Sequence, residues 1–111
     1  MSTTRIDPHV FDELQANAGA DFVAELVDTF AEEAPPLVAE MRAALAAGAA
    51  ERFRRAAHSL KSNSSTFGAA KLSELARELE LGGLPADAGG IDTLEAELGV
   101  TVAALRAMAK A

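Results

Sequence analysis

His58 is the residue of this sequence best placed to do covalent chemistry, because cationic and hydroxyl side chains surround it at helical spacing. Its neighbours three or four positions away are Arg54, Arg55, Lys61 and Ser62. Side chains at those separations meet on one face of a helix, so each can contact a group that the imidazole carries. An imidazole nitrogen is a nucleophile, and a phosphoryl group bound to it would be an anion that nearby cations stabilise. The spacing indicates phosphoryl carriage on His58, and the alternative is a solvated histidine in a solvated cationic patch.

The helix expected to carry His58 runs over residues 49–67 and is amphipathic. Its apolar face has the spacing of a bundle seam and consists of Phe53, Ala57, Leu60, Ser64 and Phe67. On a helical wheel His58 lies about 140° from the centre of that face, so its ring should point to water. Ser62 and Ser65 are small residues on the exposed side and would leave room for a partner to approach.

The composition excludes several other classes of protein. The chain has 111 residues, which fits a single domain over residues 1–111, and its net charge of −7 argues against nucleic acid as a partner. With no cysteine and two histidines, it has neither a disulfide framework nor the ligands of a thiolate or His-rich metal site. The sequence contains no glycine-rich phosphate loop and no acidic magnesium cluster. We therefore expect no ATP binding, no kinase activity and no metal or cofactor of its own.

The sequence also gives an expectation about location. No apolar run approaches the length of a membrane span, and the first residues lack the apolar core of a signal peptide. We expect a cytoplasmic, monomeric protein that does not contact membranes.

Helical periodicity predicts an all-α fold, in which an antiparallel up-down four-helix bundle over about residues 20–110 follows a short accessory helix over about 7–18. Asp7 can cap the accessory helix, and Pro8 suits its first position. Further helices are expected over 49–67, 69–81 and 91–109. A breaker-rich loop should occupy residues 82–90.

The first bundle segment, from about residue 20 to residue 47, contains two adjacent prolines. Phe22, Leu26 and Phe30 recur every four residues from about residue 20, so this row is expected to face the core. Pro35 and Pro36 should break or kink the segment before a helix over 36–47. One bent helix and two separate helices both remain open.

Residues 57–69 (Ala-His-Ser-Leu-Lys-Ser-Asn-Ser-Ser-Thr-Phe-Gly-Ala) resemble the signature of histidine-containing phosphotransfer (Hpt) domains of two-component phosphorelays. They are also similar to the phosphotransfer domain of the chemotaxis histidine kinase. The resemblance extends through Leu79 and Glu80 in close register. It departs from the family at Ser62, where the family has glycine, and this added hydroxyl bears on partner choice and transfer rate.

The resemblance implies a role for each matched residue. His58 would accept a phosphoryl group on Nε2 from a receiver aspartyl phosphate or a histidine or hybrid kinase, and pass it to the aspartate of a response-regulator receiver domain. Lys61 would stabilise the phosphoryl charge, and any Mg²⁺ would sit on the receiver. Glu80 would bind and orient the imidazole; the alternative is an ordinary ion pair with Arg77 or Lys61.

A wider surface is assigned to the phosphoryl environment and to docking. It consists of Arg54, Arg55, Ser62, Ser65 and Gly68. Apolar residues that could form the rim of this surface are Val10, Leu14, Val23 and Val27, although packing of the accessory helix on the bundle would account for them equally well. Two other functions stay open: a phosphorylation-independent adaptor or inhibitor that binds a signalling protein, and a purely structural or ligand-binding bundle.

Overall fold

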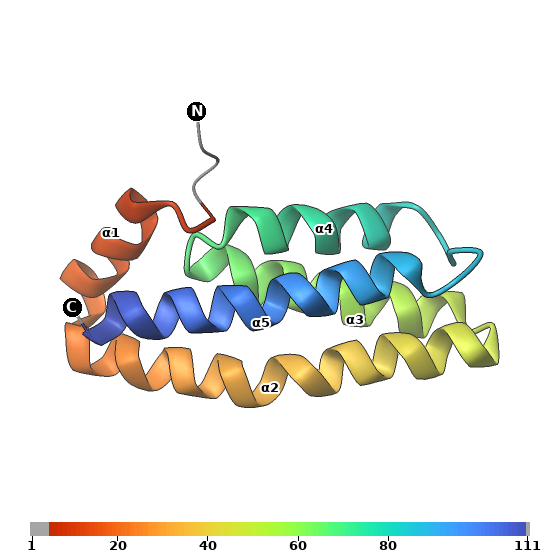
Figure 1. Cartoon of the computed structure of the whole chain (residues 1–111), viewed down its shortest axis with the longest axis horizontal. Coiled ribbons are helices and arrows are strands. Elements are labelled where there is room, and N and C mark those ends of the chain that lie inside the picture. The colour runs from red at the N-terminus through yellow and green to blue at the C-terminus, as the bar shows by residue number, and fades with distance from the viewer. Residues whose placement is uncertain (1–4, 111) are drawn as a thin grey trace.

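The computed structural model describes residues 5–110 of the chain, and this part is entirely helical (Figure 1). Its helices are α1 (Pro8–Ala18), α2 (Ala20–Ala47), α3 (Ala50–Thr66), α4 (Ala70–Leu81) and α5 (Gly89–Lys110). Helices α2 to α5 run alternately up and down, each packs on the next, and α5 returns beside α2 (Figure 1). The predicted antiparallel four-helix bundle with a short N-terminal helix is therefore confirmed. No helix of residues 5–110 is long and apolar enough to cross a membrane.

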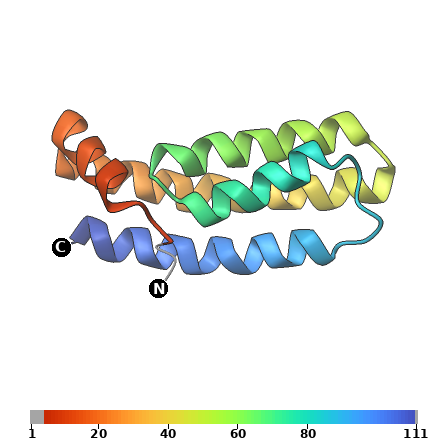
Figure 2. The same ribbon diagram turned by 90° about the horizontal axis from the view of Figure 1, so that it is seen from above.

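Helix α1 lies across the end of the bundle where α2 begins and α5 ends (Figure 2). The Asp7 carboxylate caps it by accepting the His9 backbone N–H at 2.9 Å, as the sequence predicts. Ile6 and Phe11 are buried in one cluster with Val23 and Val27 of α2. Val23 and Val27 are 0% and 2% exposed, so their proposed place in a docking rim is wrong. The alternative, packing of the accessory helix on the bundle, accounts for their burial.

Helix α2 continues through Pro35 and Pro36, so of the two alternatives that the sequence left open the structure shows one helix (Figure 1). Both prolines lie on the exposed side of α2. Their rings remove two backbone donors there, and water can satisfy the carbonyls that lose their partners. The buried row on the opposite side includes Ala34, directly before the pair, and Val38, two residues after it, and both hold the helix against the core.

The apolar row that faces the core from α2 is also offset from the predicted one. It consists of Val23, Val27, Phe30, Ala34, Val38, Met41 and Ala44. Phe22 is 52% exposed, and Leu26 is only partly buried. The first turns of α2 carry two adjacent apolar rows, and the one that contains the valines belongs to the buried core. The prediction for Phe22 is therefore wrong, while that for Phe30 is confirmed.

The core of the bundle contains the predicted apolar face of α3. Phe53, Ala57, Leu60, Ser64 and Phe67 are all buried. The rings of Phe30 and Phe67 pack with centroids 5.4 Å apart and join α2 to the end of α3. The face of α3 opposite to this core is left for solvent, and that face carries His58.

Candidate functional site

The candidate site lies on the exposed side of α3 where it meets the last turn of α4. His58 Nδ1 is 2.7 Å from Glu80 Oε2, and Lys61 Nζ is 3.0 Å from Glu80 Oε1. The His58 side chain is 53% exposed, that of Lys61 27%, and that of Glu80 only 9%. The sequence-predicted trio is therefore assembled around one carboxylate, which contacts both other residues from the neighbouring helix.

The charge on Glu80 decides which nitrogen of His58 is free. The Lys61 ammonium and the His58 ring bind this carboxyl and hold its pKa below the ordinary value, so it is ionised at neutral pH. An ionised carboxylate only accepts hydrogen bonds, so Nδ1 must donate its proton to Oε2. In the neutral ring Nε2 then keeps an unprotonated lone pair. The geometry thus leaves Nε2 as the nucleophilic nitrogen of an exposed imidazole.

The two contacts of Glu80 differ in kind. The bond from Nδ1 to Oε2 is a hydrogen bond, whereas the contact of Lys61 with the buried Oε1 is an ion pair. The ammonium of Lys61 carries three N–H donors, so it can pair with Glu80 and still donate to a new anion.

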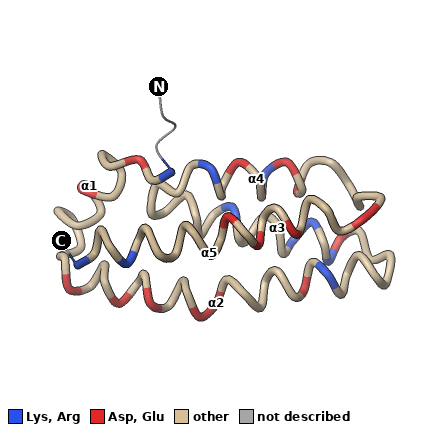
Figure 3. The backbone as a smooth tube through the Cα atoms, viewed as in Figure 1, with Lys and Arg blue, Asp and Glu red and all other residues tan. Residues whose placement is uncertain are grey.

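Two of the three arginines that precede His58 on α3 form ion pairs, which the sequence alone does not indicate. Arg52 binds Glu40 of α2 at 2.8 Å, and Arg54 binds Glu51 at 2.6 Å. Arg55 is exposed and forms no ion pair within the described part of the chain. Figure 3 shows these blue segments of α3 beside red ones. The basic run is local in sequence, but acids from α2 and from the first turn of α3 balance most of it.

The comparisons with known proteins bear directly on this arrangement. A family model described as the Hpt domain matches residues 25–108, most of the chain. The chain belongs to the Hpt domain family. Among solved structures it is similar to the crystal structure of histidine-containing phosphotransfer protein B (HptB) from Pseudomonas aeruginosa PAO1, with 29% sequence identity and a TM-score of 0.76 over 98% of this chain and 94% of that chain. A comparison with curated proteins found no match.

Membership of the Hpt family gives the chain a general role. Hpt domains are phosphotransfer carriers of two-component phosphorelays, in which a histidine is phosphorylated during signal transduction. Such a role needs an imidazole that is exposed and held in one orientation. The His58 ring is exposed, and its hydrogen bond to Glu80 orients it. Among the described residues, no cluster of three or more His, Asp or Glu side chains could hold a metal ion.

The structure separates the other predicted site residues of this Hpt domain. Ser62 is exposed one turn beyond His58 on α3. Ser65 Oγ is 2.7 Å from Ser73 Oγ of α4, so its hydroxyl already has a partner. Gly68 is buried in the turn between α3 and α4, roughly 15 Å along the helix direction from His58. Gly68 therefore belongs to the frame that supports the site and does not contact a group on His58.

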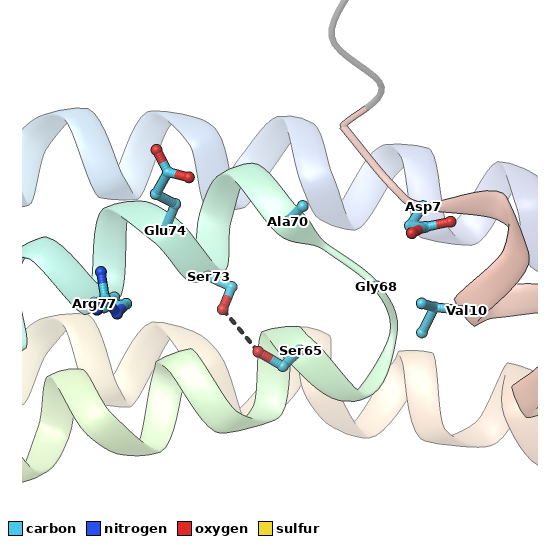
Figure 4. Close-up of a pocket in the computed structure, with 8 residues that line it drawn as sticks. All are labelled: Asp7, Val10, Ser65, Gly68, Ala70, Ser73, Glu74 and Arg77. Atoms are coloured by element: carbon cyan, nitrogen blue, oxygen red, sulfur yellow. Dashed lines mark hydrogen bonds between the residues drawn. The ribbon is translucent and has the colours of Figure 1, made fainter.

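Two residues of α4 that the sequence analysis did not assign to the site lie beside it. Ser73 contacts both Ser65 and the Lys61 carbonyl, the latter at 3.4 Å. Arg77 shares a surface depression with Ser65 and Ser73 (Figure 4). The signal for both was available in the sequence, because positions 73, 77 and 80 are spaced by four and three and so share one face of a helix.

Proposed function

We propose that this Hpt domain carries a phosphoryl group on Nε2 of His58. It would accept the group from the aspartyl phosphate of a receiver domain or from a histidine or hybrid kinase, and pass it to the aspartate of a response-regulator receiver. The observation that carries the proposal is the hydrogen bond from His58 Nδ1 to Glu80 at an imidazole that is 53% exposed. That bond presents the unprotonated nitrogen to an incoming partner.

In the transfer step, Nε2 attacks the phosphorus of the aspartyl phosphate as the P–O bond to the aspartate breaks. The ring becomes more positive as the N–P bond forms, and the Glu80 carboxylate stabilises that charge through Nδ1–H. Lys61, three residues along α3, would neutralise part of the phosphoryl charge. The reverse step returns the phosphoryl group to a receiver aspartate, and the ring returns to its neutral form.

The partner would supply the remaining chemistry in this proposal. Phosphoryl transfer depends mainly on positioning and charge neutralisation, and the receiver would contribute both the aspartate and Mg²⁺. This chain would have no kinase activity and no cofactor of its own. We propose that it acts as a monomer in the cytoplasm, a setting consistent with its cysteine-free composition.

A docking surface for the receiver is proposed beside His58, between α2 and α3. Because the receiver must bring its aspartate to Nε2, it has to contact the exposed face of α3. The groove that follows Ser62 along this face is lined by Leu26, Thr29, Phe30, Glu33, Asn63, Thr66 and Phe67. Phe22 lies one helical turn before Leu26 and is the exposed aromatic residue of α2. An aromatic side chain at the edge of an apolar groove is a typical anchor for a protein partner.

The test is phosphoryl transfer from phosphorylated receiver domains of the source organism to three forms of the chain. Wild type and His9→Gln should become labelled, whereas His58→Gln should not, because it lacks the nucleophile. His9 is the matched control, since it is the other histidine of the chain and is also exposed. The label should be acid-labile and base-stable, as expected for phosphohistidine.

Two results would contradict the proposal. Labelling of His58→Gln at the wild-type level would place the phosphoryl group on another residue. A His58→Gln variant that binds its partner and supports signalling as well as the wild type does would instead favour a phosphorylation-independent adaptor.

A further inference from the structure

Two contacts fix the register in which α3 and α4 face each other. His58 lies opposite Glu80 at 2.7 Å, and Ser65 lies opposite Ser73 at 2.7 Å. In antiparallel helices each step forward on one matches a step back on the other, and both pairs agree with the same register. This register places Arg77 of α4 opposite Lys61 of α3. Arg77 therefore lies across the interhelical groove from the lysine that is three residues beyond His58.

Arg77 is directed toward this groove and is free to bind an anion. It lines the surface depression on the same side of α4 as Ser73, whose hydroxyl contacts α3 (Figure 4). Its side chain is exposed, and it forms no ion pair in the described part of the chain. Arg42, Arg52 and Arg54 each bind acids at 3.0 Å or less, whereas Arg55, like Arg77, forms no ion pair in this part of the chain.

The guanidinium of Arg77 is not committed to an acid. Of the acids near it, Glu80 pairs with Lys61, and Asp7 and Glu74, which line the depression with Arg77, form no ion pair with it. Arg54 binds mainly Glu51. A phosphoryl group on His58 carries about −1.5 to −2 charges at neutral pH and would be a stronger anionic partner for Arg77 than a single exposed carboxylate.

We propose that Arg77 binds the phosphoryl group on His58 from α4, so that the group is held by cations of two helices. The inference rests on the proposed function of His58. Lys61 shares its charge with Glu80, a side chain that is 9% exposed, so it neutralises only part of the phosphoryl charge. With Arg77 as a second ligand, Lys61 keeps its ion pair while the phosphoryl oxygens accept hydrogen bonds from the guanidinium.

The proposal can be tested without a partner protein by labelling the chain with phosphoramidate. In this reaction the P–N bond of phosphoramidate breaks, a new N–P bond forms at Nε2 of His58, and ammonia leaves. The second ionisation of the phosphoryl group is then followed by ³¹P NMR as a function of pH. A cation in contact favours the dianion and lowers the midpoint of this titration, whereas a residue with a merely structural role leaves the midpoint unchanged.

The variants compared are Arg77→Gln, Arg77→Lys and, as a control, Lys71→Gln. Lys71 is exposed on the same helix, about 120° away around its axis, so its removal changes the net charge equally. Arg77→Gln should raise the midpoint by about 0.2–0.7 pH units at low salt, the range expected for an exposed ion pair. Arg77→Lys should restore most of the wild-type value, and high salt should reduce the difference.

The outcomes distinguish the role of Arg77 from phosphoryl carriage by His58. A midpoint in Arg77→Gln equal to that in Lys71→Gln overturns the role of Arg77 and leaves carriage by His58 intact. Absence of label on His58 in the wild type overturns both. An Arg77 effect in a chain that exchanges phosphoryl groups with none of the organism's receivers supports the anion site and overturns the proposed function.

Discussion

At the scale of single residues, Glu80 organises the site. The sequence allowed it two roles, orientation of the imidazole or an ion pair with Arg77 or Lys61. The structure shows that it both accepts a hydrogen bond from His58 and forms an ion pair with Lys61, while Arg77 does not contact it. The two roles fit together, because the lysine keeps the carboxylate ionised and an ionised carboxylate fixes the proton on Nδ1.

The lowered pKa of Glu80 predicts how its contribution to stability depends on pH. A carboxyl whose pKa is lower in the folded than in the unfolded chain stabilises the fold above the unfolded value, here about 4.5. That contribution is lost as the pH falls through the lower folded value. Glu80→Gln should therefore reduce the free energy of unfolding at pH 7, and the difference from wild type should shrink between pH 5 and pH 3.

Thermal unfolding across this pH range measures the difference. Glu74→Gln is the control, because Glu74 is exposed on the same helix and forms no ion pair among residues 5–110. If the loss of unfolding free energy in Glu80→Gln stays constant or grows in acid, the charge of the Glu80 carboxylate is not what stabilises the contact between α3 and α4.

At the scale of elements, the turn between α3 and α4 sets the register that brings His58 and Glu80 together. Gly68 has φ +74° in this turn, a conformation that side chains with a Cβ rarely adopt. Its carbonyl accepts the Asp7 backbone N–H at 2.7 Å, and a Cβ there would lie 2.8 Å from Val10 Cβ. The turn is therefore also the place where the start of α1 joins the bundle.

Gly68→Ala should destabilise the chain more than the same change at Gly48. Gly48 has φ +66° at the end of α2, but a Cβ there would meet no atom within 4 Å. Its replacement should cost about 1–2 kcal/mol of unfolding free energy from the backbone conformation alone. At Gly68 the collision with α1 should add about 1–3 kcal/mol. Urea denaturation compares the two, and equal losses would mean that α1 moves aside without cost.

At the scale of the whole molecule, α1 decides which surfaces of the bundle remain open. It packs on α2, in which Val23 and Val27 are buried and Phe22 is exposed. The start of the described chain is held in place as well, because Arg5 binds the buried Glu97 of α5, which also accepts the Thr101 hydroxyl at 3.1 Å. One end of the bundle is thus closed, while the groove between α2 and α3, which on α3 runs from Asn63 to Phe67, stays accessible.

Phe22→Ala should separate docking from folding. The phenyl ring is 52% exposed, so its loss should change the free energy of unfolding by less than about 1 kcal/mol. As an interface anchor worth about 1–2 kcal/mol, it should slow phosphoryl transfer from a sub-saturating receiver by roughly 5- to 30-fold.

Phe30→Ala is the control for Phe22→Ala, because it removes a buried phenyl ring from the same helix. Phe30 is 4% exposed, so its truncation should lower stability by about 3–5 kcal/mol. Stopped-flow transfer assays and chemical denaturation measure the two effects. Wild-type transfer by Phe22→Ala would place the receiver on another face.

The sequence by itself determined the helical fold, the amphipathic face of α3 and the position of His58 on the opposite, exposed face. These features depend on local periodicity, which the order of residues contains directly. It also indicated Lys61 and Glu80 as partners of His58, through a resemblance to the Hpt family. It could not determine which of two apolar rows of α2 faces the core, nor that Pro35 and Pro36 leave α2 continuous.

Those outcomes depend on contacts between segments that are distant in the chain. The burial of Val23 and Val27, the neutralisation of Arg52 by Glu40 and the place of Arg77 opposite Lys61 all require the register between helices. Burial and charge pairing are properties of neighbours in space, and periodicity within one helix does not contain them. The sequence placed His58 on an exposed helix face, and the tertiary structure decided which charged side chains around it remain unpaired.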